Sequence, residues 1–345
     1  MPRGITSLLS KQRRGGAGVT ANAVQLRKSS LRAGLIVAAL VLAAAAGTLI
    51  RHFALKRPAA DVTLPALSIS EWLAGHSTDW RMAGLKEHQG VLVIEFPGLA
   101  AQGAAMNRIA ALLEKADAPR DRVLDDAQLA ALIARVGDNS QTFYQGHDYD
   151  SSGLARFYAL VQQQALKLTA QERRLQKQLQ AAGLLAPTGE PPSNTSERSA
   201  WALITFTATQ PDDPATPIDE TVDAVRRASV LRHEISHGRF YVQPVYRLHC
   251  QRFWREVLSE GQRENIRSYL AGIGYDRHDE ELMLNEAQAF MMNTADTRAF
   301  NAAGIGMTED ELAALRTRFW QTLPPENDGS SSALPANAPS AATRR

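Results

Sequence analysis

The chain has a single cysteine, Cys250, and no aspartate or glutamate before Asp61. One thiol cannot form an intramolecular disulfide, so a disulfide-stapled scaffold is excluded. The lack of acidic residues leaves the N-terminal segment with basic charges alone, and seven lysines and arginines precede residue 33. The whole chain carries a net charge of only +2, so the excess of basic residues is confined to this N-terminal segment.

An uncharged run follows the basic segment. Residues 33–50 contain no charged side chain, and at about 1.5 Å per residue they span roughly 27 Å, close to the hydrocarbon thickness of a bilayer. We predict a basic cytoplasmic segment at 1–32, a transmembrane signal-anchor helix at 33–50 and a juxtamembrane linker at 51–66. A cleaved signal peptide, an organelle transit segment and a buried helix are the alternatives.

The anchor also predicts location and partners. The positive-inside rule places the N-terminus in the cytoplasm and the C-terminal part outside, in the periplasm if the protein is bacterial. The bilayer is then one partner, through residues 33–50. Nucleic-acid binding is not expected, because the basic run is juxtamembrane. No pattern indicates an oligomeric state.

Residues 67–185 are predicted to form an α+β region. Residues 91–96 are apolar and end at Pro97-Gly98, which is typical of a strand. Helical patterns follow at 100–117, 126–136 and 154–184. The last of these contains a capping box at Thr169, so it forms either one long helix or two helices that meet there.

Residues 199–323 are predicted to form a mostly helical region with one strand, at 202–208. The predicted fold class is therefore α+β and mostly helical, with a single N-terminal transmembrane helix before a catalytic domain. Residues 324–345 are rich in proline, serine, alanine and asparagine, and we predict a disordered tail there.

The helical region contains the motif His233-Glu234-Ile-Ser-His237. On a helix, residues four apart lie on one face, so both imidazoles can reach one Zn²⁺ and the glutamate between them can act on a coordinated water. We predict that this helix begins at Thr216-Pro217 and closes at Gly238. The motif predicts a zinc site in which Glu234 is catalytic.

A catalytic zinc site needs a third protein ligand, and Glu286 is the candidate. It lies in the apolar, helical stretch 278–294, where a buried carboxylate needs a partner such as a metal ion. Rival donors lie nearby: His249, Cys250, His278, Asp279, Glu280 and Glu281.

Two other classes of metal site lack required residues. Metzincins need a glycine and a histidine at positions where this chain has Phe240 and Gln243. A di-iron centre uses two Glu-x-x-His units, and only His237 has a glutamate three residues before it.

Together with Asn285-Glu286-Ala-Gln-Ala289, the His-Glu-x-x-His motif resembles the gluzincin metallopeptidases of the thermolysin-like clan. The resemblance covers residues 230–289. It implies a zincin-like catalytic domain, with His233, His237 and Glu286 as zinc ligands and Glu234 as the general base. Thermolysin has an aspartate four positions after its ligand glutamate, whereas this chain has Phe290, so the partner that orients His233 is unassigned.

The leading hypothesis is a membrane-anchored zinc metallopeptidase that hydrolyses a peptide or protein by a glutamate-activated water. The alternative is a catalytically inactive, membrane-tethered scaffold or regulatory protein with a structural or vestigial motif. Four side chains are candidates to stabilise the transition state, and each has a purely structural role as its alternative: Tyr246, His249, His147 and Tyr275.

Overall fold

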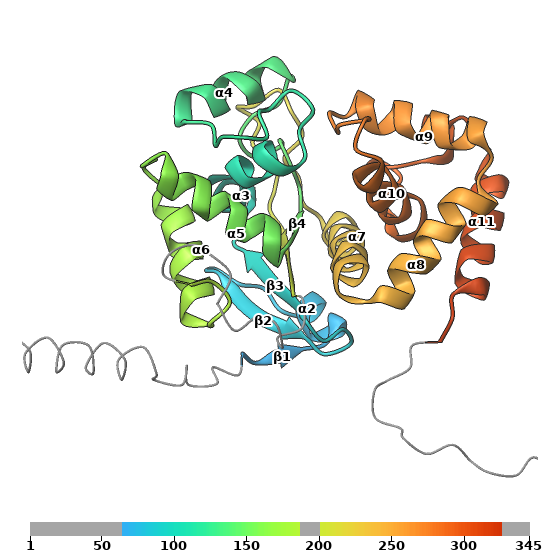
Figure 1. The fold of residues 1–345 in the computed structure, drawn as a ribbon, viewed down its shortest axis with the longest axis horizontal. Helices are drawn as coiled ribbons and strands as arrows, with labels where there is room; N and C mark the ends of the chain where they lie inside the picture. The colour runs from blue at the N-terminus through green and yellow to red at the C-terminus, as the bar shows by residue number, and fades with distance from the viewer. Residues whose placement is uncertain (1–63, 187–200, 326–345) are drawn as a thin grey trace, which may run out of the picture. The chain divides into compact units, whose positions relative to one another are not determined.

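A mixed sheet of five strands, in the order β1-β2-β3-β5-β4, lies at the centre of the fold. The computed structural model describes residues 64–186 and 201–325 (Figure 1). β3 and β5 pair in parallel, whereas β2 and β4 run antiparallel to their neighbours β3 and β5. The strands are β1 (Ala66–Leu67), β2 (Arg81–Leu85), β3 (Val91–Phe96), β4 (His147–Asp150) and β5 (Ala202–Thr207).

The two central strands are buried along their whole length. Such strands are apolar on both sides because both faces of the sheet are covered. The predicted strand at 91–96 is confirmed as β3, and the one at 202–208 is β5, which ends one residue earlier. β5 pairs with a strand on each side, so β4, next to it, is the edge strand at that end of the sheet.

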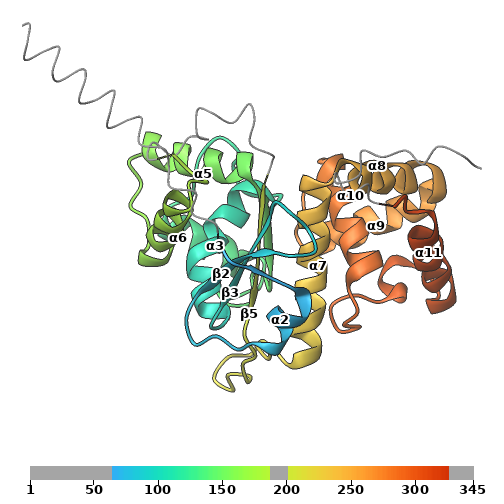
Figure 2. The same cartoon turned by 90° about the horizontal axis from the view of Figure 1, so that it is seen from below.

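Three helices lie over one face of the sheet (Figure 2): α3 (Leu99–Leu113), α5 (Ser151–Gln163) and α6 (Ala170–Ala181). α4 (Asp126–Arg135) adds Leu132 and Ile133 to the same core. Thr169 caps α6 through a capping box, so the stretch 154–184 forms two helices and not one. Side chains of α3, α5 and α6 pack on this face, among them Ile109, Phe157 and Leu175.

The helix that carries the His-Glu-x-x-His motif, α7 (Ala224–Val242), covers the opposite face. Leu231 and Ile235 pack there against Ile204 and Phe206, together with the short helix α2 (Ile69–Ala74). Our predicted helix ends are wrong. α7 begins after Asp223, whose side chain accepts a hydrogen bond from Arg226 N, and Gly238 lies within it.

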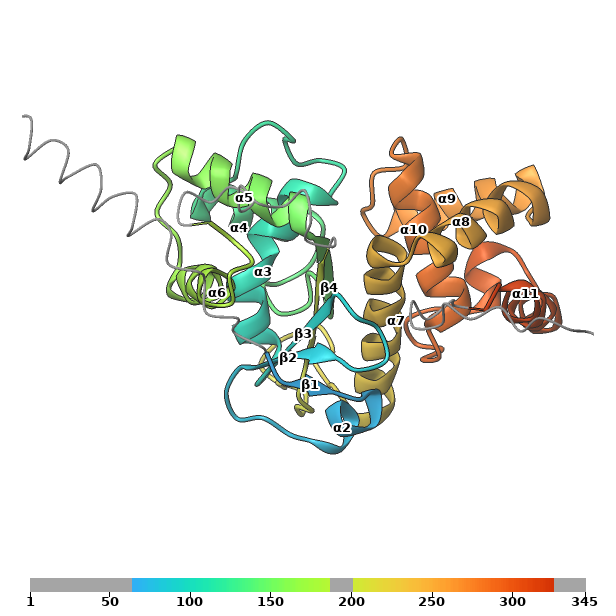
Figure 3. The ribbon, with the colours of Figure 1, turned by 60° about the horizontal axis from the view of Figure 1, so that its bottom comes forward.

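Beyond α7 the chain forms a helical subregion with its own core, built on side chains such as Trp254, Met283 and Phe319. α7 therefore lies between the sheet and these helices (Figure 3). Two of the elements are π-helices, η1 and η2. The elements are α8 (Pro244–Arg252), η1 (Phe253–Val257), α9 (Glu260–Gly272), α10 (Glu280–Gln288), η2 (Ala289–Asn293), the 3₁₀ helix η3 (Ala302–Ile305) and α11 (Glu309–Thr322).

One part of the predicted fold class is corrected. The fold is α+β, with helices over about 54% of the described residues, but the membrane-spanning helix is not part of it. Within residues 64–186 and 201–325, no helix is both long and apolar enough to cross a bilayer. Even α7, with 19 residues, carries four arginines and a glutamate. This finding conflicts with the predicted single-pass location, in which the N-terminus is cytoplasmic and the C-terminal part lies outside.

Several predicted segments lie outside the described residues. They are the basic segment 1–32, the uncharged run 33–50, the linker 51–66 up to residue 63, and the tail 324–345 beyond residue 325.

Replacement of Gly238 by alanine should destabilise the fold, although alanine favours helix. A Cβ atom there would lie 2.8 Å from Val91 Cγ1 and 3.1 Å from its Cγ2, so the helix and sheet must shift. We expect a loss of about 1–3 kcal/mol in the free energy of unfolding. Gly261→Ala is the matched control, because its Cβ meets open space and should stabilise by up to about 1 kcal/mol. Urea denaturation of both variants checks this, and equal shifts would contradict it.

Candidate metal centre

The two motif histidines present the same ring atom to each other. On α7 they are one turn apart, and His233 Nε2 lies 3.1 Å from His237 Nε2. Both side chains are buried, His237 completely. Two nitrogens at this separation on one helix face can share a metal ion.

Glu286, on α10, completes a triangle with the histidines. Its Oε2 atom lies 3.9 Å from His233 Nε2 and 3.8 Å from His237 Nε2. A circle through the three atoms has a radius of about 2.1 Å, which is the length of zinc–nitrogen and zinc–oxygen bonds. A single point is therefore at ligand distance from all three.

The chemistry of these donors also fits a cation. Glu286 is only 2% exposed, and its Oε2 has no hydrogen-bond partner in the described part of the chain. An orphaned buried carboxylate oxygen is costly unless something positive meets it. None of the rival donors has this environment. Asp279 caps α10, and Glu280 and Glu281 pair with arginines. His249 bonds to the Phe319 carbonyl, Cys250 lies in the helical core, and His278 is exposed.

The partner that orients His233 is Thr294, which follows η2. Thr294 Oγ1 donates to the Ala289 carbonyl at 3.1 Å and accepts from His233 Nδ1 at 2.8 Å. The proton on Nδ1 leaves the Nε2 lone pair free for a metal. His237 Nδ1 has no such partner among the described residues.

Phe290 contacts His233 by packing and not by hydrogen bonding. Its ring lies 4.6 Å from the imidazole, centroid to centroid, at 71°. The hydrogen-bond acceptor for His233 is instead Thr294, eight positions after Glu286, because the chain between them passes through a π-helix. No local sequence pattern distinguishes this threonine, so sequence reasoning missed it.

Asp148, on the edge strand β4, brings another carboxylate to the centre. Its Oδ2 lies 3.6 Å from His237 Nε2, and its Oδ1 accepts from the Tyr241 hydroxyl at 2.7 Å. Asn285 Nδ2 donates to the same hydroxyl. Asp148, Glu234 and His237 also form a set of donors within 4.8 Å of one another. This residue received no specific assignment from the sequence.

The electrostatics of the centre favour a positive ion. Burial lowers the pKa of His233, and His237 lowers it further. Burial raises the pKa of Glu286, as do Asp148 and Glu114, whereas Tyr275 and Lys115 lower it. The pKa of Glu234 is raised by burial first and then by Asp148. A divalent cation would offset the charge of these carboxylates and favour their ionised forms.

Glu234 lies against the main chain just before β4. Its Oε2 has no hydrogen-bond partner among residues 64–186 and 201–325. A Cβ atom added to Gly146 would overlap the Glu234 carboxylate and approach Val230 Cγ1 at 2.8 Å. Glycine at position 146 is thus what leaves room for this side chain.

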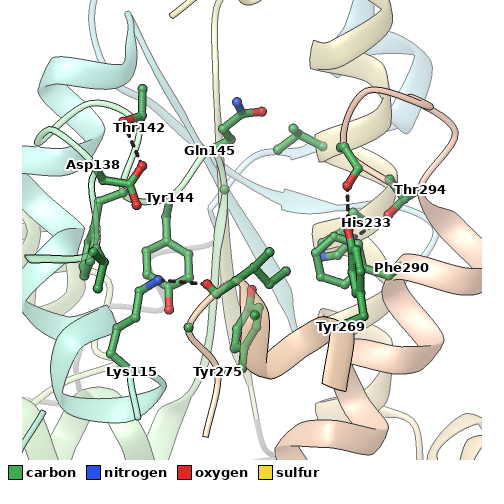
Figure 4. A pocket seen from close by; sticks show the side chains of 18 of the residues that line it. Lys115, Asp138, Thr142, Tyr144, Gln145, His233, Tyr269, Tyr275, Phe290 and Thr294 are labelled. Carbon is green, nitrogen blue, oxygen red and sulfur yellow. Dashed lines mark hydrogen bonds between the residues drawn. The ribbon is translucent and has the colours of Figure 1, made fainter. Parts of the chain in front are cut away.

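A cavity of about 700 Å³ opens beside His233 and Glu234. Figure 4 shows Lys115 and Tyr144 on one side of it and His233 and Phe290 on the other. Lys115 Nζ donates to the Ile273 carbonyl and lies 4.6 Å from the centroid of the Tyr144 ring. Aromatic side chains and a lysine therefore both line the cavity near the centre.

Of the four candidate stabilisers, only Tyr275 lines this cavity. The Tyr246 hydroxyl donates to Gln288 Oε1, and His249 Nε2 donates to the Phe319 carbonyl, within the helical core. His147 is buried on β4, where its Nδ1 bonds to the Tyr149 hydroxyl, and burial lowers its pKa to about 3.

Comparisons of the chain with protein-family models, with curated proteins and with solved structures give no match.

Replacement of Thr294 by valine should weaken zinc binding. Valine keeps the shape but removes the acceptor for His233 Nδ1, so the ring is no longer held in its tautomer and orientation. We expect a loss of zinc affinity of about 10- to 100-fold. Competition against a chromophoric chelator measures it. Thr294→Ser, which keeps the hydroxyl, should bind nearly as tightly as the unaltered protein, and a valine variant of undiminished affinity would refute the assignment.

Proposed function

We propose that this protein is a zinc-dependent peptidase that hydrolyses peptide bonds with Glu234 as the proton carrier. The observation that carries the proposal is the meeting of His233, His237 and Glu286 around one point at zinc–ligand distance. Beside it lies Glu234, whose Oε2 has no hydrogen-bond partner within residues 64–186 and 201–325. The resemblance of residues 230–289 to gluzincins supports the same function.

The residues of the chain divide the work as follows. His233, His237 and Glu286 would hold the ion, which, when bound, supplies Lewis acidity that activates a water and polarises the substrate carbonyl. Glu234 takes the proton from the attacking water and passes it to the departing amine. Its carboxylate is suited to this because Oε2 has no other partner in the described residues.

The cavity supports a peptide with an apolar or aromatic side chain near the cleaved bond. Tyr144, Tyr275 and Phe290 lie on its wall, and the volume of about 700 Å³ is in the range of small-molecule and side-chain sites. Tyr275, which lies beside Glu286, is the donor that we assign to the carbonyl oxygen.

Replacement of Glu234 by glutamine should separate binding from catalysis. The amide cannot accept the proton, so hydrolysis should fall by about 10²- to 10⁴-fold. Zinc content should not change, because Glu234 is outside the ligand triangle. Peptide cleavage is followed with a library of quenched fluorescent peptides and zinc by atomic absorption.

The controls distinguish an enzyme from the inactive scaffold. Glu256→Gln changes an exposed glutamate and should leave cleavage intact, whereas His237→Ala should lose both zinc and cleavage. Stoichiometric zinc without cleavage of any peptide by the unaltered protein would favour the scaffold. Full activity in Glu234→Gln would rule out the assigned role.

Replacement of Gly146 by alanine should displace Glu234 without removing the metal ligands. Because a misplacement of about 1 Å can cost roughly 100-fold in rate, we expect a loss of that order in cleavage with zinc affinity retained. Gly272→Ala is the matched control, since Gly272 lines the same cavity and its Cβ would meet open space. The rates of the two variants are compared at equal zinc loading, and equal rates would contradict the prediction.

A further inference from the structure

Two chain segments that are far apart in sequence meet at the cavity beside the metal centre. They are residues 115–120, which follow α3, and residues 272–276, which begin the connection from α9 to α10. The amide of Ala116 donates to the Gly274 carbonyl at 3.2 Å, and both segments contribute residues to the cavity lining. We call this contact the clasp. It joins the end of α3, which packs on the sheet, to the helical subregion.

Lys115 supplies a buried ammonium group to the clasp. Its side chain is on the cavity wall, and the residue is only 5% exposed. Its Nζ atom donates to the Ile273 carbonyl at 3.3 Å. The same atom lies 4.6 Å from the centroids of the Phe143 and Tyr144 rings, a distance at which a cation is attracted to an aromatic face. One charged atom thus holds a carbonyl of the second segment and two rings of the cavity wall.

Acidic neighbours offset part of the cost of burying this ammonium group. Burial lowers the pKa of Lys115, whereas Glu114, Asp138 and Glu286 raise it. Lys115 nevertheless forms no ion pair within residues 64–186 and 201–325. Its direct contacts there are the Ile273 carbonyl and the two rings, so the ammonium group acts on the clasp and not as one half of a salt bridge.

Tyr275 is the residue that the clasp places beside the metal centre. Lys115 and Tyr275 face each other in an isolated antiparallel β-bridge. The rings of Tyr144 and Tyr275 meet edge to face, with their centroids 6.2 Å apart. Burial raises the pKa of Tyr275, and the nearby Glu286 raises it further. The main chain of Tyr275 is therefore fixed by the clasp, and its ring packs on Tyr144.

We propose that Lys115 is a positioning residue that holds Tyr275 at the metal centre. The inference rests on the proposed function, in which the Tyr275 hydroxyl donates to the carbonyl oxygen of the peptide. Without the ammonium group, the segment 272–276 would keep one main-chain hydrogen bond and the ion pair of Arg120 with Asp276, which is 3.7 Å long and partly exposed. Such ion pairs contribute little, so the segment would shift and move Tyr275 with it.

The test compares Lys115→Met, which keeps the length of the side chain but removes its charge, with Lys177→Met at an exposed position of α6. Because a misplacement of about 1 Å can cost roughly 100-fold in rate, Lys115→Met should lower kcat for peptide cleavage by about 10- to 100-fold. KM and zinc affinity should not change, since a donor that acts in the transition state affects kcat. Equal rates in the two variants, or a loss of zinc affinity in Lys115→Met, would overturn the proposal.

The conservative variant Lys115→Arg should rescue the rate. A guanidinium group can donate to the same carbonyl and stack on the same rings. Most of the kcat lost in Lys115→Met should therefore return. An arginine variant as slow as the methionine variant would mean that the charge at position 115 does not hold the clasp.

A double-mutant cycle shows whether Lys115 acts through Tyr275. Tyr275→Phe removes the hydroxyl and should lower kcat by about 100- to 1000-fold. Lys115→Met should cost little more in that background, because the hydroxyl that it positions is already absent. Losses that multiply in the double variant would refute the inference, since Lys115 would then act on its own.

Gly274→Ala disturbs the clasp from its other segment. Gly274 has a φ of +97°, and a Cβ atom there would lie 2.9 Å from Lys115 Nζ. This variant should lower kcat as Lys115→Met does, and it too should have little effect in the Tyr275→Phe background. Gly272→Ala is the matched control, because its Cβ would meet open space. Equal rates in the two glycine variants would contradict the proposal.

A measurement without substrate separates this inference from the proposed function. Hydrogen exchange of the Ala116 amide, which bonds to Gly274 in the clasp, should be faster in Lys115→Met and unchanged in Lys177→Met. Circular dichroism checks that both variants are folded. If the unaltered protein cleaves no peptide, the proposed function fails, and the exchange result alone decides whether Lys115 holds the segment that carries Tyr275. Unchanged exchange in Lys115→Met would overturn the proposal in either case.

Discussion

The close packing of α7 on the sheet is the constraint on which the rest of the structure depends. Gly238 brings the helix backbone against Val91 and Ile204, and Arg227 bonds to buried Glu95 and to the Trp72 carbonyl. These two anchors lie about three turns apart on the helix, so they fix its rotation as well as its distance from the sheet. Rotation decides where His233 and His237 point. The metal centre is therefore a consequence of how tightly one helix face meets the strands.

The same packing forces acidic groups together. Asp148 from β4, Glu234 from α7 and Glu286 from α10 are buried around the two motif imidazoles; Asp148 raises the pKa of both glutamates, and Glu286 raises that of Glu234. Burying them costs free energy, which a fold retains only when something offsets it. A cation among the three ligand atoms would do so. The burial of these carboxylates thus agrees with the geometry of the triangle, since both point to a cation at the same place.

The sequence predicted the features of the centre that depend on neighbouring positions in one helix. It missed the residues that reach the centre through tertiary contacts. Helix spacing placed the motif histidines on one face, and the apolar context of Glu286 singled it out among rival donors. The predicted start of α7 at Thr216-Pro217 was wrong, although these residues suit a helix N-terminus. In the structure, nearby Glu220 instead accepts hydrogen bonds from Asn139 and Gln141, which come from a distant part of the chain. Thr294 and Asp148 are 61 and 89 positions from their histidines. No helical or strand period spans such separations, so only the folded chain brings them together.

Thr294 links α7 to α11. Its hydroxyl accepts from His233 Nδ1, and its carbonyl accepts from Arg316 of α11. The π-helix before it makes this double role feasible, since the wider turn moves Phe290 onto the His233 ring and carries Thr294 past the end of the helix. A regular α-helix would have kept the threonine backbone inside the helical hydrogen-bond pattern. The irregular turn is therefore part of how the centre is built, because it supplies the acceptor that residue 290 lacks.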